Sequence, residues 1–301
     1  MFKNATVYRI SPDWVAGLPH IEESLAKHQF GDCGQTQQES SGWVPPRAGN
    51  GALAETVAGQ IFLTLRTDTR KVPADVLEKQ IEEICTTIED ETGRRPGKKH
   101  RKELKEQALL ELLPQAFIKT SETMVWIDRK NDLLVVDTAT QARADYVTSM
   151  VIRSLDGMAL SLLNTDKTPS VAMTGWLHFG EADTPFQLGR ELELHAFDET
   201  KAIVRYSNHN LDTDEVKQHI VAGKAPTRLA LTWDGRVSFV LTESGHLRKL
   251  SFLDVVFENT SREDNADAFD ANAAIFTGEL GKLIPDLVDA LGGEQKLSAA
   301  E

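Results

Sequence analysis

The side chains in this sequence that are best suited to do chemistry are three aspartates near its C-terminal end. Asp264, Asp267 and Asp270 recur every third residue, and clustered carboxylates bind the metal ions of two-metal nucleases. The same acids interleave with Ala266 and Phe269. Acids are also favoured in the first turn of a helix, where they meet the positive end of its dipole. The run therefore supports two interpretations, a metal site and the start of a helix.

The other reactive groups do not combine into a catalytic set. No two of the eight histidines have the four-residue spacing that brings two ring nitrogens onto one face of a helix. The sequence has no glycine-rich phosphate loop and no G-x-S-x-G turn for a nucleophilic serine. Cys33 and Cys85 form no C-x-x-C motif, and Cys85 falls among the apolar positions of a predicted helix. We therefore expect no enzyme activity, no catalytic residue, no metal and no cofactor.

Positive charge is concentrated in one short segment. The net charge of −13 argues against nucleic-acid binding if it is spread evenly, because an acidic surface repels phosphate. Within twelve residues, however, one acid accompanies seven bases: Arg94, Arg95, Lys98, Lys99, Arg101, Lys102 and Lys105. That window carries +6 and the rest of the chain −19. The segment is either a solvated helix end or a surface that contacts nucleic acid.

Two predicted helices position these bases. Pro73 opens the first helix, whose apolar face consists of Val76, Leu77, Ile81, Ile84, Cys85 and Ile88. Gly93, Pro96 and Gly97 interrupt it, and a second helix runs from about residue 98 to Pro114. The pair is expected to form a helical hairpin or bent arm with the basic cluster near its tip.

The rest of the chain alternates strands and helices without regular βαβ order. Strands are predicted at 6–10, 42–46, 60–66, 124–128, 133–137, 192–197, 202–206, 227–233, 236–241 and 246–252. Helices are predicted at 141–154, 213–222 and about 262–291. A further helix after Asp13 starts late or kinks, because Pro19 falls inside its apolar stripe, and 31–41 is predicted to be a loop. The order indicates an α+β fold with mixed antiparallel sheets and a protruding helical arm.

The same pattern suggests how the chain divides. We expect an N-terminal α+β region of residues 1–72 and 120–165, a helical arm of 73–119, and a C-terminal α+β region of 166–301. The N-terminus lacks the charged and apolar stretches of a signal peptide, and no segment approaches the roughly 20 apolar residues of a membrane span. With two isolated cysteines, this predicts a cytoplasmic protein without a membrane partner.

Short segments distributed over nearly the whole chain form an ordered set. The segments are Phe2–Asn4, Val7–Arg9, Gly42–Pro46, Leu112–Phe117, Trp126–Asp128, Leu229–Trp233, Phe269–Ala271, Thr277–Leu280 and Leu291–Glu294. Their order and spacing resemble the RdgC family of recombination-associated proteins. The resemblance implies α+β, horseshoe-shaped subunits that close into a ring-shaped homodimer around double-stranded DNA. It further implies binding with little sequence preference, restraint of RecA-mediated strand exchange, association with the nucleoid, and no enzyme activity. A metal-dependent nuclease is the alternative that the aspartate run would support.

The resemblance also implies roles for particular residues. Phe117 matches the aromatic at the tip of the family's arm, where two subunits meet, and Pro114 and Ile118 flank it. An apolar residue just after a helix-ending proline is readily exposed, and ordinary core packing is the alternative for Phe117. The predicted DNA contacts are Arg94, Arg95, Lys98, Lys99, Arg101, Lys102, Lys119, Arg129, Lys130, Arg205, Lys217 and Lys224. Gln115, Ser207 and Asn208 stand where the family often has bases, and the Gly93–Gly97 break replaces a charged helical run.

Overall fold

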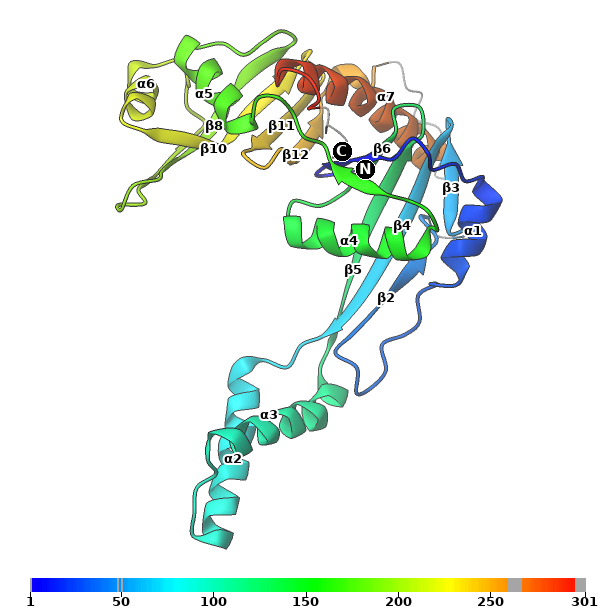
Figure 1. Cartoon of the computed structure of the whole chain (residues 1–301), viewed down its shortest axis with the longest axis vertical. Helices are drawn as coiled ribbons and strands as arrows, with labels where there is room; N and C mark the ends of the chain where they lie inside the picture. The colour runs from blue at the N-terminus through cyan, green and yellow to red at the C-terminus, as the bar shows by residue number, and fades with distance from the viewer. Residues whose placement is uncertain (1, 48, 50, 259–266, 296–301) are drawn as a thin grey trace, which may run out of the picture.

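Two antiparallel sheets and a helical arm make up the protein (Figure 1). The computed structural model describes residues 2–47, 49, 51–258 and 267–295. The larger sheet has the order β2-β4-β5-β6-β1-β7, with β3 paired to β4. Its strands are β1 (Thr6–Ile10), β2 (Glu39–Val44), β3 (Ala54–Val57), β4 (Gln60–Arg70), β5 (Ile118–Asp128), β6 (Leu133–Val136) and β7 (Leu160–Leu162). The α+β prediction is confirmed at this level.

The second sheet has five strands in the order β12-β11-β10-β8-β9. Its strands are β8 (Phe186–Ala196), β9 (Ile203–Ser207), β10 (Lys224–Trp233), β11 (Val237–Thr242) and β12 (Leu247–Phe252). The meander β10-β11-β12 was predicted from its turn dipeptides, and Asp234, Gly235 and Gly245 adopt the positive φ that such turns need. The described helices are α1 (Leu18–Ala26), α2 (Ala74–Thr92), α3 (Lys98–Leu112), α4 (Gln141–Ser154), α5 (Pro169–Phe179), α6 (Asp214–Val221) and α7 (Asp267–Ala290).

Some predicted boundaries are wrong for identifiable reasons. The predicted late start of the first helix is confirmed, because α1 begins at Leu18 with Pro19 in its first turn, where no backbone N–H is needed. Asp13 therefore does not cap this helix. The predicted loop at 31–41 ends earlier, because β2 begins at Glu39. Helix α5 and strands β3 and β7 were not predicted. No described helix is both long enough and apolar enough to span a membrane.

The arm is connected to the two longest strands of the larger sheet. β4 and β5 pair as far as Arg70 and Ile118, and α2 and α3 follow from their ends (Figure 1). Gly93 ends α2 in the left-handed conformation, which glycine adopts without steric cost. The two helices share a small core of their own: Leu77, Ile81, Cys85, Leu104 and Ala108. The predicted arm and the buried position of Cys85 are therefore confirmed.

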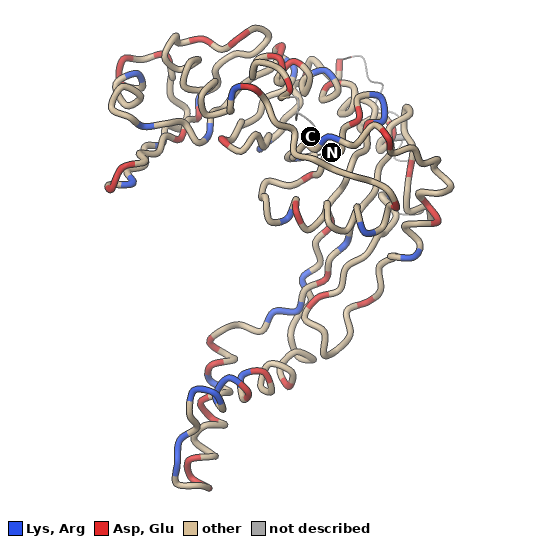
Figure 2. Tube along the Cα trace, viewed as in Figure 1, with Lys and Arg blue, Asp and Glu red and all other residues tan. Residues whose placement is uncertain are grey.

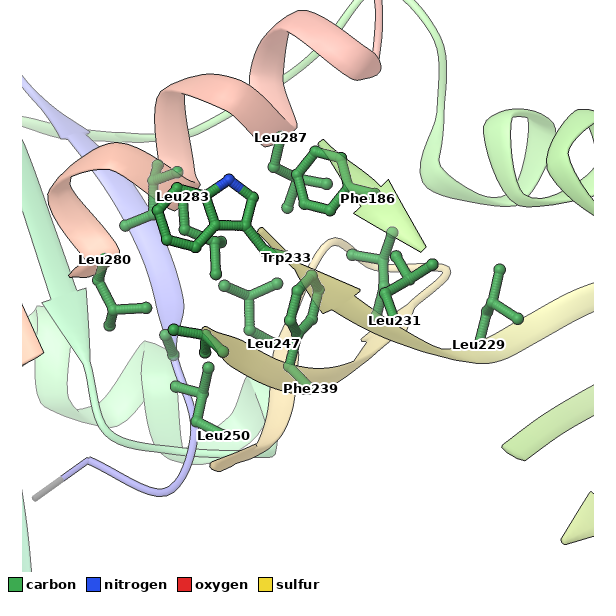
Figure 3. Close-up of a cluster of buried hydrophobic side chains, with 14 of the residues drawn as sticks. Phe186, Leu229, Leu231, Trp233, Phe239, Leu247, Leu250, Leu280, Leu283 and Leu287 are labelled. Carbon is green, nitrogen blue, oxygen red and sulfur yellow. The ribbon is translucent and has the colours of Figure 1, made fainter. Parts of the chain in front are cut away.

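Helix α7 joins the two sheets into one core. Phe276 stacks on Phe2 at 4.3 Å between ring centroids and meets Trp126 edge-on at 5.2 Å. Farther along α7, leucines face the side chains of β10 and β11 (Figure 3), and Trp233 Nε1 donates to Asp286 at 2.8 Å. Residues of α5 pack into the same cluster. Helices α5 and α7 cover one face of the five-stranded sheet. The opposite face, called the open face below, carries the exposed side chains of Arg205 and Arg228.

Candidate nucleic-acid interface

Helix α3 presents most of the predicted basic segment. Leu104 and Ala108 turn inward to α2, while Lys98, Lys99 and Lys102 are exposed. Figure 2 shows bases along α3 and the turn before it, opposite acids along α2. Over residues 73–115 there are ten acids and eight bases. The arm is therefore a pair of oppositely charged helices with one basic side, and the arm as a whole is not cationic.

Two of the predicted DNA contacts are engaged within the arm. Arg95 pairs with Glu82, and Arg101 pairs with Glu78 and lies 3.5 Å from Glu82. These side chains are substantially exposed, so each pair adds at most about 1 kcal/mol to stability. The pairs hold α3 and the turn before it against α2. They leave five exposed cations without an ion-pair partner among the described residues: Arg94, Lys98, Lys99, Lys102 and Lys105.

The structure separates residues that lie close to the arm in sequence. Lys119 stands opposite Thr69 at the arm end of β5, whereas Arg129 and Lys130 form the turn after the other end of that strand. Ten residues of extended chain span about 30 Å. Of these three predicted contacts, only Lys119 lies on the arm side of the larger sheet, and Arg129 and Lys130 lie at the opposite end of β5.

The second predicted group belongs to the five-stranded sheet and α6. Arg205 Nε donates to Glu193 at 2.6 Å. Lys217 donates to Asp212 at 2.8 Å, and this hydrogen bond raises the pKa of the lysine. Lys224 Nζ lies 3.2 Å from His219 Nδ1. These cations are all in contact with other side chains, so a phosphate would have to compete with existing partners.

Three bases beside Arg205 were not predicted from the sequence. Arg228 of β10 and Arg248 and Lys249 of β12 line the same cavity on the open face of the five-stranded sheet. A signal was available, because Arg228 and Arg248 occupy polar positions in strands that alternate with buried leucines.

Phe117 is an exposed aromatic at the root of the arm. It lies between a short 3-10 turn (Leu113–Gln115) and β5, with 95% of its surface exposed, and Ile118 beside it is 43% exposed. Core packing of Phe117 is therefore excluded, and exposure after a helix-ending proline is confirmed. The far end of the arm is formed instead by the Gly93–Gly97 turn.

The aspartate run is only partly visible. Asp264 lies outside the described residues, and Asp267 begins α7. Asp270 Oδ1 accepts from Arg47 at 3.0 Å, and Arg47 also pairs with the buried Glu55 at 2.9 Å. In the described ranges, no three histidine, cysteine, aspartate or glutamate side chains are grouped so that they could hold a metal ion.

Comparisons with known proteins agree on one family. A family model described as "Putative exonuclease, RdgC" matches residues 1–294. The recombination-associated protein RdgC of Bordetella pertussis is 41% identical over 298 residues, covering 98% of this chain and 99% of that protein. The protein of the same name from Cupriavidus necator is 42% identical over 297 residues, covering 98% and 99%. The chain belongs to the RdgC family of recombination-associated proteins.

Proposed function

We propose that this protein binds double-stranded DNA through its backbone phosphates, without reading base sequence, and that it acts in recombination without catalysing a reaction. The observation that carries the proposal is the exposed basic side of α3 in a chain of net charge −13. Lysine and arginine contacts to phosphate hold a duplex but carry no sequence information. The relatives' name, recombination-associated protein, supports the same setting.

We further propose that two subunits enclose the duplex and thereby restrain RecA on it. The arm and the five-stranded sheet extend toward the same side of the larger sheet, which gives the subunit a bent outline (Figure 1). The exposed Phe117 offers an apolar contact for a second subunit. Acidic surfaces elsewhere on the chain would repel DNA and leave the basic side of α3 as the attractive surface. Association with the nucleoid would follow from such binding.

The arm's contribution is tested by measuring duplex affinity over a range of salt concentrations. Changing Arg94, Lys98 and Lys99 to Gln should weaken binding and lower the salt slope by about 0.9 for each lost phosphate contact. The matched control changes the exposed Lys27, Lys167 and Lys282 to Gln, which should alter neither quantity. If both triple variants bind with the wild-type affinity and slope, the arm does not contact DNA.

The exonuclease in the family description defines the competing function. Metal-dependent cleavage needs carboxylates free to bind metal, whereas Asp270 is already bonded to Arg47. Linear duplex incubated with the protein and Mg²⁺ should remain intact over hours. Cleavage that copurifies with the protein and is lost in Asp270→Asn would replace the binding proposal with a nuclease.

A further inference from the structure

Three arginines form a row across the open face of the five-stranded sheet. Arg205 of β9 and Arg228 of β10 both stand opposite Glu193 of β8, which lies between them. Arg248 of β12 stands opposite Val240 of β11, the strand on the other side of β10. Arg205 and Arg228 are two strands apart, or about 10 Å between backbones. Arg228 stands opposite Thr242, two residues from Val240 on β11, so Arg248 is displaced along the strands as well as across them. The row therefore runs obliquely across the strands and places three guanidinium groups on one face of the sheet.

A backbone irregularity adds a fourth cation to this face. Successive residues of a regular strand point to opposite faces, yet Arg248 and Lys249 line the same cavity. Lys249 has φ of 52°, and the pairing of β11 with β12 shifts register between Ser238 and Val240. A lysine in the left-handed region is strained, and such strain tends to occur at functional sites. The irregularity places two consecutive bases on one side of β12.

The cavity between these side chains has a volume of about 330 Å³ and an excess of positive charge. Four cations and two carboxylates, Glu191 and Glu193, line the cavity. Lys249 bonds to Glu191 at 2.5 Å, and Glu193 bonds to Arg205 and lies 3.5 Å from Arg228. In the part of the chain that the structure describes, Arg248 has no ion-pair partner. Glu193 therefore holds Arg205 and Arg228 in place. Because the cavity has two more cations than carboxylates, positive charge remains to attract an anion.

The charge of Arg248 also affects His246, a buried residue beside the cavity. His246, which is buried on the same strand edge, bonds through Nε2 to Gln141 Oε1 at 2.9 Å. Its pKa is lowered by burial and, after that, by the charge of Arg248. A neutral His246 acts as a hydrogen-bonding partner of α4 and does not add charge of its own.

We propose that this cavity binds a phosphate group, with Arg228 and Arg248 as direct contacts and Arg205 and Lys249 flanking them. Guanidinium forks match the geometry of phosphate oxygens. The inference rests on the proposed function for its choice of ligand, a phosphate of the duplex backbone. It adds a second contact surface, separate from the arm, so that the duplex is held at both ends of the bent subunit.

The test measures anisotropy of a labelled duplex over a salt series for wild type, Arg248→Gln, the double variant Arg228→Gln/Arg248→Gln and the control Lys282→Gln. Arg248→Gln should weaken binding about fivefold and lower the salt slope by about 0.9. The double variant should lose more on both counts. Arg248→Lys keeps the charge and should restore the slope, whereas the control should match wild type. Melting temperatures verify that every variant is folded.

Calorimetric titration with inorganic phosphate distinguishes the two sources of the ligand. A saturable heat that Arg248→Gln abolishes assigns the cavity to phosphate in general, and duplex effects without such heat assign it to the backbone; both support the proposal. Unchanged duplex affinity and slope in the double variant, with no phosphate heat, overturn it while the proposed function stands. If the wild type fails to bind duplex at all, the proposed function fails instead, and the calorimetry alone decides about the cavity.

Discussion

Glu193 is a buried carboxylate that binds the arginines on the open face of the five-stranded sheet. It is only 6% exposed and accepts hydrogen bonds from Arg205 at 2.6 Å and from Thr227 at 3.0 Å. Burial acts to raise its pKa, but those hydrogen bonds and the charges of Arg205 and Arg228 outweigh burial, so the pKa lies below the ordinary value. The carboxylate is therefore ionised at neutral pH and stabilises the sheet face that carries the arginine row.

This predicts a pH-dependent cost for Glu193→Gln. A carboxyl group whose pKa is lowered by folding stabilises the native state above its unfolded pKa, and that stability is lost as the pH falls through the folded pKa. The variant should unfold at lower urea concentration near pH 7, with a loss of about 1 kcal/mol, since its arginine partners are largely exposed. The difference from wild type should shrink below about pH 4. A pH-independent difference would mean that packing, and not charge, is responsible.

Phe117 carries a second prediction at the scale of one residue. If it forms an apolar contact between subunits, Phe117→Ser should shift the protein toward monomer in sedimentation analysis at micromolar concentration. The melting temperature of the monomer should change little, because the ring is 95% exposed and packs against nothing in its own subunit. Val15→Ser, at a position that is 80% exposed, is the matched control. Equal dimer fractions in all three proteins would remove Phe117 from the interface.

The burial or exposure of a residue was predictable from the sequence where its neighbours in the chain determine it. The ion-pair partner of a residue was not predictable where that partner lies far away in the chain. The exposure of Phe117 followed from Pro114, and the burial of Cys85 followed from helical periodicity. The pairing of Arg95 with Glu82 and of Arg205 with Glu193 was not predictable, because it depends on which helix or strand lies alongside. Arg228 and Arg248 were not predicted because no motif marks them, although both occupy polar positions that alternate with buried leucines in their strands.

At the scale of elements, the arm behaves as a small separate unit. Its core of five buried residues is not shared with either sheet, and only β4 and β5 connect it to the larger one. The glycines and prolines at their ends predicted α2 and α3. Helix α5 was not predicted, because its apolar residues lie on most sides of the helix. Three-residue β7 exists only because β1 offers it an edge. Such elements have no local signal of their own.

The separate core predicts that damage to the arm stays local. Ile81→Ala removes a fully buried side chain and should destabilise the arm by about 2–4 kcal/mol. Hydrogen exchange should then accelerate in residues 74–112 and remain unchanged in β1 and β6. Val76→Ala, at a position 44% exposed, serves as the control and should exchange like wild type. Faster exchange throughout the larger sheet would show that the arm and the sheet unfold together.

At the scale of the whole molecule, the two sheets depend on contacts between the ends of the chain. Phe2 packs on Phe276 of α7, and Ala5 forms a bridge with Leu247 of β12. The apolar stripe of α7 was visible in the sequence, but the surfaces it joins were not, because contacts over such separations leave no local pattern. This shared core fixes the two sheets relative to each other, while β4 and β5 alone carry the arm. The enclosure proposal depends on both connections.

Enclosure makes a prediction that ordinary surface binding does not share. A closed dimer can leave a linear duplex by sliding off an end, whereas on a circle it must open first. After a jump to high salt, which weakens the phosphate contacts, complexes should therefore persist longer on a nicked circular plasmid than on the same plasmid cut once. Phe117→Ser should abolish that difference, and Arg248→Gln should speed release from both forms while preserving it. Equal lifetimes of wild type on circle and line would show that the protein binds duplex without surrounding it.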